Sequence, residues 1–530
     1  MPRSGRDAPA GVVAAGHRLS ARAGAEALAR GGNAVDAVVA AAYTAAVCES
    51  PLTGPGAGGF MLSRSPGGRT TLLDFFVSAP GLGPRGRRLS PEDLDQFTVE
   101  FGGADQVFHI GPASVAVPGM VAGLGEAARR LGTLPALELV EAAARAAREG
   151  VVLSAESGYL HRILTGMLTH SPEAAAIYAP GGRLLDEGDV LRNPELAESL
   201  IHLARAGAQS LYEGELAGLL VDHLERTGGL VTREDLRGYR VIDRVPLTVG
   251  FRDVSVLTNP PPSAGGALIA AALAVLGTEG PAPDEPARCR AVVRAGRRAN
   301  RLRTPEFAAG LHQSDSMERL WARLSDEDDD AGRQGEDRKP AGSTTHISAV
   351  DDRGGMASLS SSNGSGSGVV LPGTGILLNN MLGEQDLNPA GFGATEPGVR
   401  ITSMMAPTLL LRDGRPLAAL GAAGSNRLRS AILQTIVAVV DGGLTLREAV
   451  DRPRVHPEGD GVDVEGGVGE PCVEALLADG HRLRRWGGMN LFFGGVSIAG
   501  HDAHGPSGAG DPRRGGAAAL ATRSGEVIDL

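Results

Sequence analysis

The sequence predicts an α/β protein in which layers of helices pack against strands. Alanine-rich apolar segments at residues 17–48 and 115–150 are typical of helices. Residues 345–350 alternate roughly between polar and apolar side chains, as a half-buried strand does. Residues 325–343 carry almost no apolar side chains and predict a flexible linker within the chain.

The remaining elements continue this mixed pattern. Gly31, Gly32 and Asn33 predict a break between two helices within residues 17–48. The region at residues 115–150 is expected to be helical after the Pro118-Gly119 turn. Further strands are expected at residues 241–258, 345–359, 408–411 and 417–420, and further helices at residues 427–441 and 473–476.

The bulk composition excludes several classes of protein. A net charge of −11 gives no electrostatic footprint for nucleic acid. No apolar run approaches the roughly 20 residues needed to span a bilayer, so no membrane partner is expected. The N-terminal residues lack the apolar core of a secretion signal, which predicts a cytoplasmic protein.

The sequence indicates neither a metal nor a cofactor. Cys48, Cys289 and Cys472 are far apart, with neither metal-ligand spacing nor a disulfide framework. The glycine-rich residues 54–59 fit a dinucleotide pattern, but a helix-like segment precedes them where that fold needs a strand. The acidic residues 326–330 lack the spaced ligands of a calcium loop and fit a solvated linker.

The most informative feature is the segment Ser-Thr-Thr-His-Ile-Ser at residues 343–348. Cleavage between Ser343 and Thr344 would give Thr344 a free α-amine beside its own hydroxyl. Such an amine has a pKa near 8 and can activate the hydroxyl as a nucleophile. A flexible linker that runs into a strand suits this chemistry, because the linker must leave while the strand holds the nucleophile. The plain alternative is a Thr-Thr pair with only a structural role in a strand.

Several short motifs follow one another along the chain: GGNAVDA (31–37), GGFML (58–62), PGMVAGL (118–124), GGLVTREDLRGY (228–239), PPPSAGG (260–266), TTHIS (344–348), GILLNN (375–380), TSMMAPT (402–408) and GAAGSNR (421–427). In their kind and order they make the chain similar to the γ-glutamyltranspeptidase family of N-terminal-nucleophile hydrolases. The likeness spans most of residues 11–525, so it is specific for the family but not for a substrate.

The resemblance implies a four-layer αββα sandwich built from two pieces of one self-cleaved precursor. Residues 1–343 would form the large subunit, including the linker, and residues 344–530 the small catalytic subunit, paired as a heterodimer. Thr344 would attack a γ-glutamyl or similar acyl carbonyl of a small-molecule amide. Water, an amino acid or a peptide would then release the acyl group.

The resemblance also assigns roles to residues around the nucleophile. His346 is expected to be a strand or supporting residue rather than a base, because the amine of Thr344 fills that role. Ser361, or Ser362 as its competitor, would supply the hydroxyl that bonds the nucleophile, and Asn363 would orient the substrate. Glu384 would bind the α-ammonium of the substrate, and Thr402 and Ser403 would bind its α-carboxylate. The N–H groups of Gly424 and Ser425 would form the oxyanion hole.

One departure from the family pattern concerns the substrate. Phe76 stands where the family carries the arginine that clamps the γ-glutamyl carboxylate, and phenylalanine cannot make that charged, bidentate contact. Either Arg400 or Arg427 replaces this arginine, or the substrate is different. The alternatives are a β-lactam side-chain acylase, a carbon–carbon bond hydrolase, and an uncut, non-catalytic relative.

Two further departures favour hydrolysis over strict glutathione chemistry. Met381 replaces a polar residue that usually follows the Asn379-Asn380 pair. Only 17 residues separate Glu384 from Thr402, which predicts a short lid and an open pocket.

Overall fold

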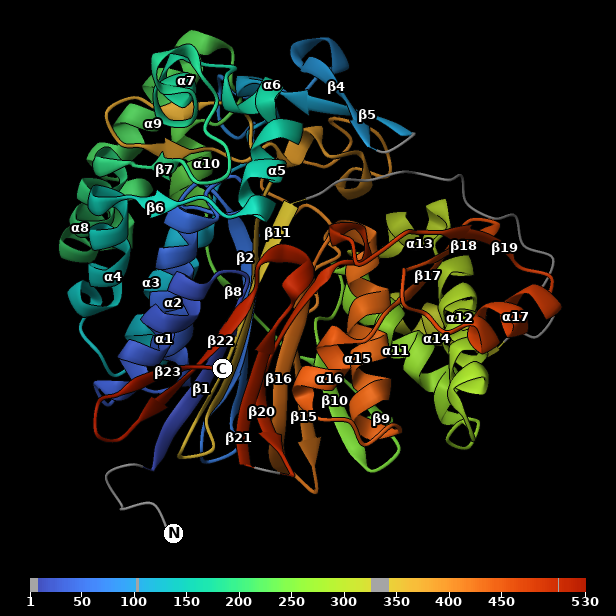
Figure 1. The fold of residues 1–530 in the computed structure, drawn as a ribbon. Helices are drawn as coiled ribbons and strands as arrows, with labels where there is room; N and C mark the ends of the chain where they lie inside the picture. The colour runs from blue at the N-terminus through green and yellow to red at the C-terminus, as the bar shows by residue number, and fades with distance from the viewer. Residues whose placement is uncertain (1–7, 102–103, 326–342, 504) are drawn as a thin grey trace.

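The computed structural model describes residues 8–101, 104–325, 343–503 and 505–530, and shows two large β-sheets packed face to face between layers of helices (Figure 1). The predicted α/β class and the αββα sandwich are therefore confirmed. Most of the predicted linker, residues 326–342, lies outside the described residues.

The first sheet carries the predicted nucleophile. Its eight strands lie in the order β23-β22-β1-β11-β12-β2-β3-β8, and every neighbouring pair is antiparallel. The strands are β1 (Pro9–Ala15), β2 (Gly58–Arg64), β3 (Thr70–Phe75), β8 (Ile242–Arg244), β11 (Ser343–Asp351), β12 (Met356–Gly364), β22 (Ala517–Thr522) and β23 (Val527–Asp529). Because β11 lies between β1 and β12, both of its edges are paired.

The second sheet supplies the opposite wall of the site. Its six strands lie in the order β21-β20-β16-β15-β10-β9 and are also antiparallel. They are β9 (Leu247–Phe251), β10 (Val254–Thr258), β15 (Thr408–Arg412), β16 (Arg415–Ala423), β20 (Gly495–Asp502) and β21 (Gly505–Gly510). Strands β16 and β20 face β11 across the sandwich.

Helices cover both outer faces of the sandwich (Figure 1). On the eight-stranded sheet lie α1 (Arg18–Ala29) and α2 (Ala34–Cys48). The predicted break between them is confirmed, since Asn33 caps α2 and exchanges hydrogen bonds with Asp36. On the six-stranded sheet lie α11 (Ala264–Gly277), α15 (Leu428–Val440) and α16 (Leu446–Asp451).

The other elements extend the two ends of the sandwich. The predicted helical region at residues 115–150 forms α3 (Met120–Leu131) and α4 (Ala136–Glu149). The remaining elements are α5 (Ala155–Ile163), α6 (Thr165–Leu168), α7 (Pro172–Tyr178), α8 (Pro194–Ala206), α9 (Glu215–Thr227), α10 (Arg233–Gly238), α12 (Glu285–Arg301), α13 (Pro305–Gly310), α14 (Ser316–Ser325) and α17 (Glu470–Ala478), with short strands β4 (Asp95–Phe101), β5 (Ala104–Ile110), β6 (Val151–Val152), β7 (Val190–Leu191), β13 (Val370–Leu371), β14 (Ile376–Leu377), β17 (Val455–Glu458), β18 (Gly461–Val464) and β19 (Arg482–Arg485).

The period of two along β11 divides its side chains between two environments. His346 points between the sheets, where a Cβ on Gly421 of β16 would overlap its ring. Thr345 points the other way and donates a hydrogen bond to Glu49, which follows α2. Thr344, two residues before His346, therefore lies on the side that faces the second sheet.

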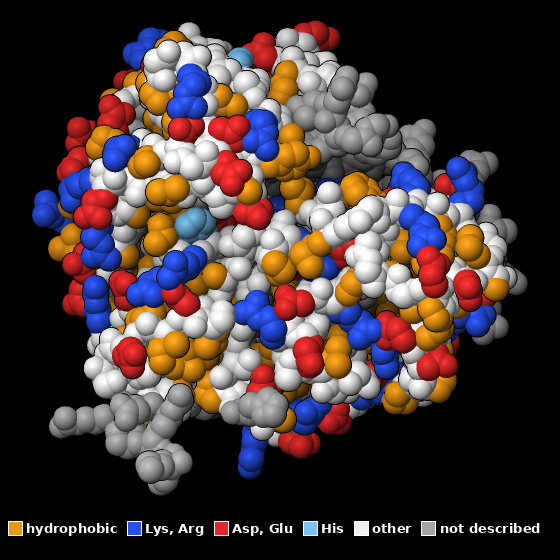
Figure 2. Space-filling model, in the orientation of Figure 1, with side chains coloured by type: hydrophobic (Ala, Val, Ile, Leu, Met, Phe, Trp, Pro, Cys, Tyr) orange, Lys and Arg blue, Asp and Glu red, His pale blue; other side chains and the backbone are white. Residues whose placement is uncertain are grey.

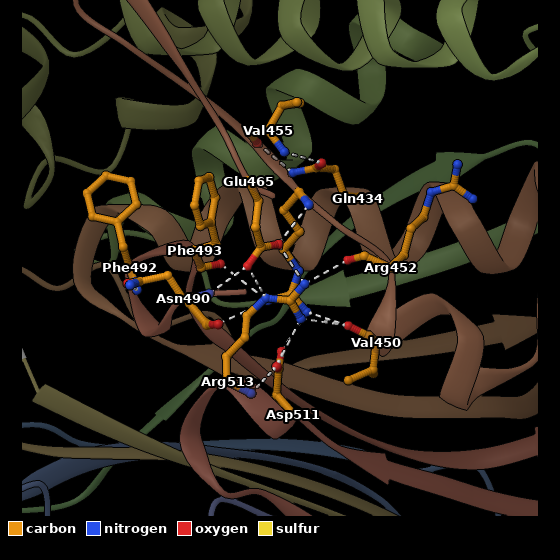
Figure 3. Close-up of polar contacts among 12 residues, drawn as sticks. Gln434, Val450, Arg452, Val455, Glu465, Asn490, Phe492, Phe493, Asp511 and Arg513 are labelled. Atoms are coloured by element: carbon orange, nitrogen blue, oxygen red, sulfur yellow. Dashed lines mark hydrogen bonds and ion pairs between the residues drawn. The ribbon is translucent and has the colours of Figure 1, made fainter. Parts of the chain in front are cut away.

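A buried ion network joins the loops at one end of the second sheet (Figure 3). Asp511 pairs with Arg454 at 2.6 Å (Oδ2–Nη2) and with Arg513 at 3.0 Å (Oδ1–Nη1). Arg513 also contacts Glu465 at 2.6 Å (Nη2–Oε2), and Arg454 Nη1 donates to the Gly494 carbonyl at 3.0 Å. Gly494 packs against Gly424, so this network supports the loop that ends β16.

Charged side chains of both signs lie on the surface. Basic and acidic side chains are interspersed on the face shown in Figure 2, and neither sign gathers into a patch there. Among the described residues, no helix has the length and apolar character needed to cross a membrane.

Candidate active site

A small pocket opens where the start of β11 meets the end of β16. It collects side chains from both pieces of the predicted precursor and contains five of the site candidates that the sequence implicated: Thr344, Ser362, Glu384, Ser403 and Ser425. The full lining is Phe76, Thr344, Ser362, Gly364, Met381, Glu384, Asp386, Leu387, Ser403, Met404, Met405, Ser425 and Leu428.

Thr344 is 5% exposed and stands at the second position of β11. The Ser343–Thr344 bond therefore lies at the start of a strand whose two neighbours fix its direction. His346 hydrogen-bonds Ser360 through Nδ1 (2.8 Å) and Ser348 through Nε2 (2.9 Å). Burial lowers the pKa of His346 to about 3, so its ring is neutral at physiological pH and held in the strand layer.

The two candidate serines on β12 differ in what they face. Ser361 pairs with Thr345 across the strands, and its hydroxyl lies 2.7 Å from the Thr53 hydroxyl. Ser362 points the other way and lines the pocket with Thr344. The structure thus brings Ser362 to the pocket and places Ser361 on the side of the helix layer.

Asn363 is fully buried, yet neither its side-chain oxygen nor its nitrogen has a hydrogen-bond partner among the described residues. Its backbone is fixed, because its N–H donates to Leu52 O and its carbonyl accepts from the Asn380 N–H. A buried amide without a partner in the protein costs free energy unless a ligand or a water molecule bonds it, so the Asn363 side chain is available to such a group.

The Gly424-Ser425 pair turns the chain out of β16 into α15. Gly424 has φ 121°, and Ser425 has φ 51°, in the left-handed region that a non-glycine residue adopts at a cost. The described residues offer no backbone acceptor to either N–H group. The Ser425 hydroxyl donates to Asp386 Oδ2 at 3.1 Å, which holds the turn against the facing segment.

The Pro-Pro-Pro-Ser-Ala-Gly-Gly motif supports the Thr402-Ser403 segment. Ser263 donates to the Met405 carbonyl at 2.7 Å, and Asn259 Nδ2 donates to the same oxygen at 3.0 Å. A Cβ at Gly265 would lie 1.8 Å from the Met404 carbonyl, so only glycine permits this packing. Ser403 consequently lines the pocket.

Thr402 and the asparagine pair of the GILLNN motif are engaged in the framework instead. The Thr402 hydroxyl donates to Leu387 O at 2.7 Å. Asn379 Nδ2 donates to the carbonyls of Gly56 (2.8 Å) and Ala116 (3.0 Å), and Asn380 Oδ1 accepts from Ser365 N at 2.7 Å.

Two carboxyl groups give the pocket its electrostatic character. Burial, reinforced by the charge of Asp386, raises the pKa of Glu384 to about 7, and a hydrogen bond from Ser365 (3.1 Å) partly opposes this shift. Burial also raises the pKa of Asp386. Within the described part of the chain, no Lys or Arg lines the pocket. A ligand group with a positive charge is therefore favoured there.

The structure places Phe76 in the pocket lining, stacked on Phe60 with ring centroids 5.5 Å apart. Arg400 is committed elsewhere, because it pairs with Asp74 (Nε–Oδ1 3.3 Å) and its guanidinium lies 4.4 Å from the centre of the Tyr239 ring. Arg427 donates to the Phe492 carbonyl and stacks on that ring.

Sequence reasoning missed several lining residues, including Asp386. Asp386 follows Glu384 by two residues in a single turn of 3-10 helix, Gln385–Leu387, which such a short segment does not reveal in the sequence. Met404 and Met405 lie in the TSMMAPT motif, in which the family resemblance gives a role only to Thr402 and Ser403. Among the described residues, no group of His, Cys, Asp or Glu is arranged to hold a metal ion.

The fold and pocket define a sandwich of the N-terminal-nucleophile hydrolase class. The sequence profile of the family described as Gamma-glutamyltranspeptidase matches residues 20–521. The chain therefore belongs to the γ-glutamyltranspeptidase family, whose members are hydrolases and transferases.

Relatives of two kinds resemble the chain over most of its length. It is 32% identical over 505 residues to the Acylase ACY 1 proenzyme of Pseudomonas sp. strain SE83, covering 91% of this chain and 89% of the relative. It is 30% identical over 509 residues to the Glutathione hydrolase proenzyme of Escherichia coli K12, covering 89% and 86%. The crystal structure of a cephalosporin acylase from Bacillus halodurans superposes with a TM-score of 0.80 at 27% identity, covering 100% of this chain and 98% of that one.

Proposed function

We propose that the protein is a self-processing amidohydrolase that cuts its own chain between Ser343 and Thr344 and then uses Thr344 as an N-terminal nucleophile. The Thr344 hydroxyl oxygen attacks the amide carbonyl of a small-molecule substrate while its proton passes to the α-amine. The amine then protonates the departing nitrogen and an acyl-enzyme remains. Water, or an acceptor amine, releases the acyl group. On this proposal residues 1–343 and 344–530 are the two subunits.

The Gly424-Ser425 turn supports an oxyanion hole. Two consecutive N–H groups, for which the described residues offer no backbone acceptor, stand at the end of β16; Ser425 lines the pocket that holds Thr344, and Gly424 precedes it. Donors fixed in this way stabilise the negative oxygen of a tetrahedral intermediate, and the loss of one donor costs about 3–4 kcal/mol. Because the donors belong to the backbone, the serine side chain at position 425 does not prevent this role.

The other candidate residues, in the pocket lining or next to it, are assigned to binding the nucleophile or the substrate. Ser362 is the hydroxyl proposed to bond the nucleophile, because it shares the pocket with Thr344 while Ser361 bonds Thr53. Asn363, whose amide has no partner, orients the substrate. Ser403 contacts the acyl group, with Thr402 as its support.

The single observation that carries the proposed substrate class is Phe76 in the pocket wall. An aromatic ring replaces the charge clamp, while Arg400 is engaged by Asp74. Apolar side chains and two carboxyl groups suit an acyl chain with an apolar stem or an ammonium group better than one that ends in a carboxylate. We therefore favour acylase-type chemistry like that of the relatives named as acylases.

A second candidate is γ-glutamyl hydrolysis or transfer, because Glu384 lies in the pocket where it can bind an α-ammonium. The two candidates differ in their need for a carboxylate partner. An arginine at position 76 should therefore help the second candidate and not the first.

The test begins with mass spectrometry of the purified protein. Wild type should give a piece that starts at Thr344 and spans the 187 residues to the C-terminus, whereas Thr344→Ala should stay as one chain of 530 residues. An uncut, active wild type would refute the proposal.

Chromogenic anilides then assign the substrate class. Matched hexanoyl, glutaryl and γ-glutamyl anilides are compared in wild type and Phe76→Arg. Preference of the wild type for the hexanoyl anilide, together with a gain of γ-glutamyl turnover in Phe76→Arg, would support the acylase assignment. A wild type that prefers the γ-glutamyl anilide would contradict it.

A further inference from the structure

The segment of residues 49–53 connects α2 to the strands that carry the site. Glu49 Oε2 accepts a hydrogen bond from the Thr345 hydroxyl at 2.7 Å. The Thr53 hydroxyl lies 2.7 Å from that of Ser361. One segment of the N-terminal piece thus contacts both β11 and β12 next to the nucleophile.

The contact between Glu49 and Thr345 is enclosed. A Cβ at Gly16 would lie 2.3 Å from Glu49 Oε2 and 3.0 Å from Thr345 Oγ1, so the main chain of residue 16 packs directly on the pair. Glu49 is 8% exposed and Thr345 is 1% exposed. Ser20 lies 3.5 Å from the other carboxyl oxygen, and Arg514 is the nearby cation.

A strand that begins at its nucleophile has a specific mechanical problem. Before cleavage, the chain on both sides of residue 344 restrains it. After cleavage, Thr344 is a chain end, and chain ends lose order unless something holds them. The bond from the Thr345 hydroxyl to Glu49 is the first side-chain hydrogen bond that follows the new terminus.

We propose that Glu49, acting through Thr345, is a positioning residue that holds the new N-terminus in the pocket once the chain has been cut. The inference rests on the proposed function, since it requires Thr344 to be the nucleophile. Thr53 assists by fixing Ser361 on the neighbouring strand. None of these side chains touches the substrate, because they lie on the face of the sheet that packs on the helices.

This role predicts a particular kinetic signature. A displacement of the nucleophile by about 1 Å can lower a rate by about 100-fold while the binding groups keep their places. Loss of the bond between Thr345 and Glu49 should therefore reduce kcat and leave KM within about twofold. A merely structural contact would change the melting temperature and leave kcat of the folded enzyme unaltered.

The experiment uses Thr345→Val, which keeps the shape and removes the hydroxyl, and Thr345→Ser, which restores it. The fraction that has been cut is measured by mass spectrometry, and kcat and KM refer to that fraction only, with the best anilide for wild type. Thr345→Val should lower kcat by about 10- to 100-fold, and Thr345→Ser should recover to within about threefold. Thr435→Val removes an equally buried hydroxyl, bonded to Ala431 O at 2.8 Å, and should keep wild-type kcat.

Glu49 provides a second test if Thr345→Val does not fold. Glu49→Gln keeps an acceptor oxygen and should retain more kcat than Glu49→Leu, which keeps none. Equal kcat in wild type and Thr345→Val, or in Glu49→Gln and Glu49→Leu, would overturn the inference and leave the proposed function intact. An uncut wild type, or full activity in Thr344→Ala, would instead refute the proposed function itself.

Discussion

Two buried polar regions of this molecule, linked through the packing of Gly494 on Gly424, are built in opposite ways. In the ion network of Arg454, Asp511, Arg513 and Glu465, no buried side-chain atom lacks a partner (Figure 3). In the neighbouring site, the Asn363 amide has no partner within the described residues. On the proposed function, the difference separates polar groups that maintain the fold from groups that bind a ligand.

The largest effect is expected from removing Asp511, which belongs to the ion network. Burial alone would raise the pKa of Asp511, but Arg454 and Arg513 hold it below its ordinary value. Asp511→Ala leaves two buried guanidinium groups without this partner and should cost about 3–5 kcal/mol of unfolding free energy, measured in guanidinium chloride. The stability that this carboxylate contributes is present above its unfolded pKa and is lost as the pH falls through the lower folded value.

A surface pair gives the control for Asp511. Asp460 pairs with Arg482, whose side chain is 80% exposed, so Asp460→Ala should cost less than about 1 kcal/mol. Equal losses in the two variants would mean that the buried network has no special part in stability.

The next largest effect is expected at Asn363. Asn363→Ala should lower kcat/KM by about 100-fold, because the unpaired amide is proposed to contact the substrate, while unfolding free energy stays within about 1 kcal/mol. Asn379→Ala is the matched variant, since all of the hydrogen bonds recorded for its side chain are made with backbone groups. It should lose about 1–3 kcal/mol of stability. Reversal of this pattern would exchange the roles given to the two asparagines.

A smaller effect follows from the pKa of Glu384, about 7. Below that pH the carboxyl becomes neutral and can no longer pair with an ammonium, so kcat/KM for a 6-aminohexanoyl anilide should fall relative to the matched hexanoyl anilide. Between pH 7.5 and 5.5 this ratio should fall by roughly tenfold per unit at most. Using the ratio cancels the titration of the Thr344 amine, which affects both substrates. In Glu384→Gln the ratio should not change with pH.

Much of this architecture could be predicted from local signals. Helices α1 and α2 with the break at Asn33, strand β11, and α15 follow from alanine-rich, alternating and apolar patterns. The single strand run expected at residues 345–359 is instead divided by a turn into β11 and β12. Sequence analysis did not assign β1 or β22 to the sheet, although β1 pairs with β11, β22 pairs with β1, and β22 belongs to a chain segment far from β1. Such long-range pairing is set by the tertiary fold, which a local pattern does not encode.

Only those parts of the site that lie in or near the family motifs could be predicted from the sequence. The positions of Thr344, Glu384, Ser403 and Ser425 around one pocket follow the family motifs, whereas Asp386 and the orientation of Ser362 depend on which way short turns face. The ion pair of Arg400 could not be predicted either, because its partner Asp74 lies 326 residues away along the chain.

The smallest effect concerns Ser425, which combines strain with a compensating bond. Its left-handed backbone costs about 1–2 kcal/mol in a non-glycine residue, and its bond to Asp386 returns about 1 kcal/mol. Ser425→Ala keeps the strain and loses the bond, whereas Ser425→Gly loses both. Glycine should therefore be more stable than alanine by about 1–2 kcal/mol in denaturant unfolding, with wild type between them. Since both variants retain the backbone N–H, their kcat should remain within about threefold of wild type. Equal stability of the two variants would show that the turn is unstrained. Residue 425 would then resemble the fully hydrogen-bonded ion network rather than the site with its unpaired polar groups.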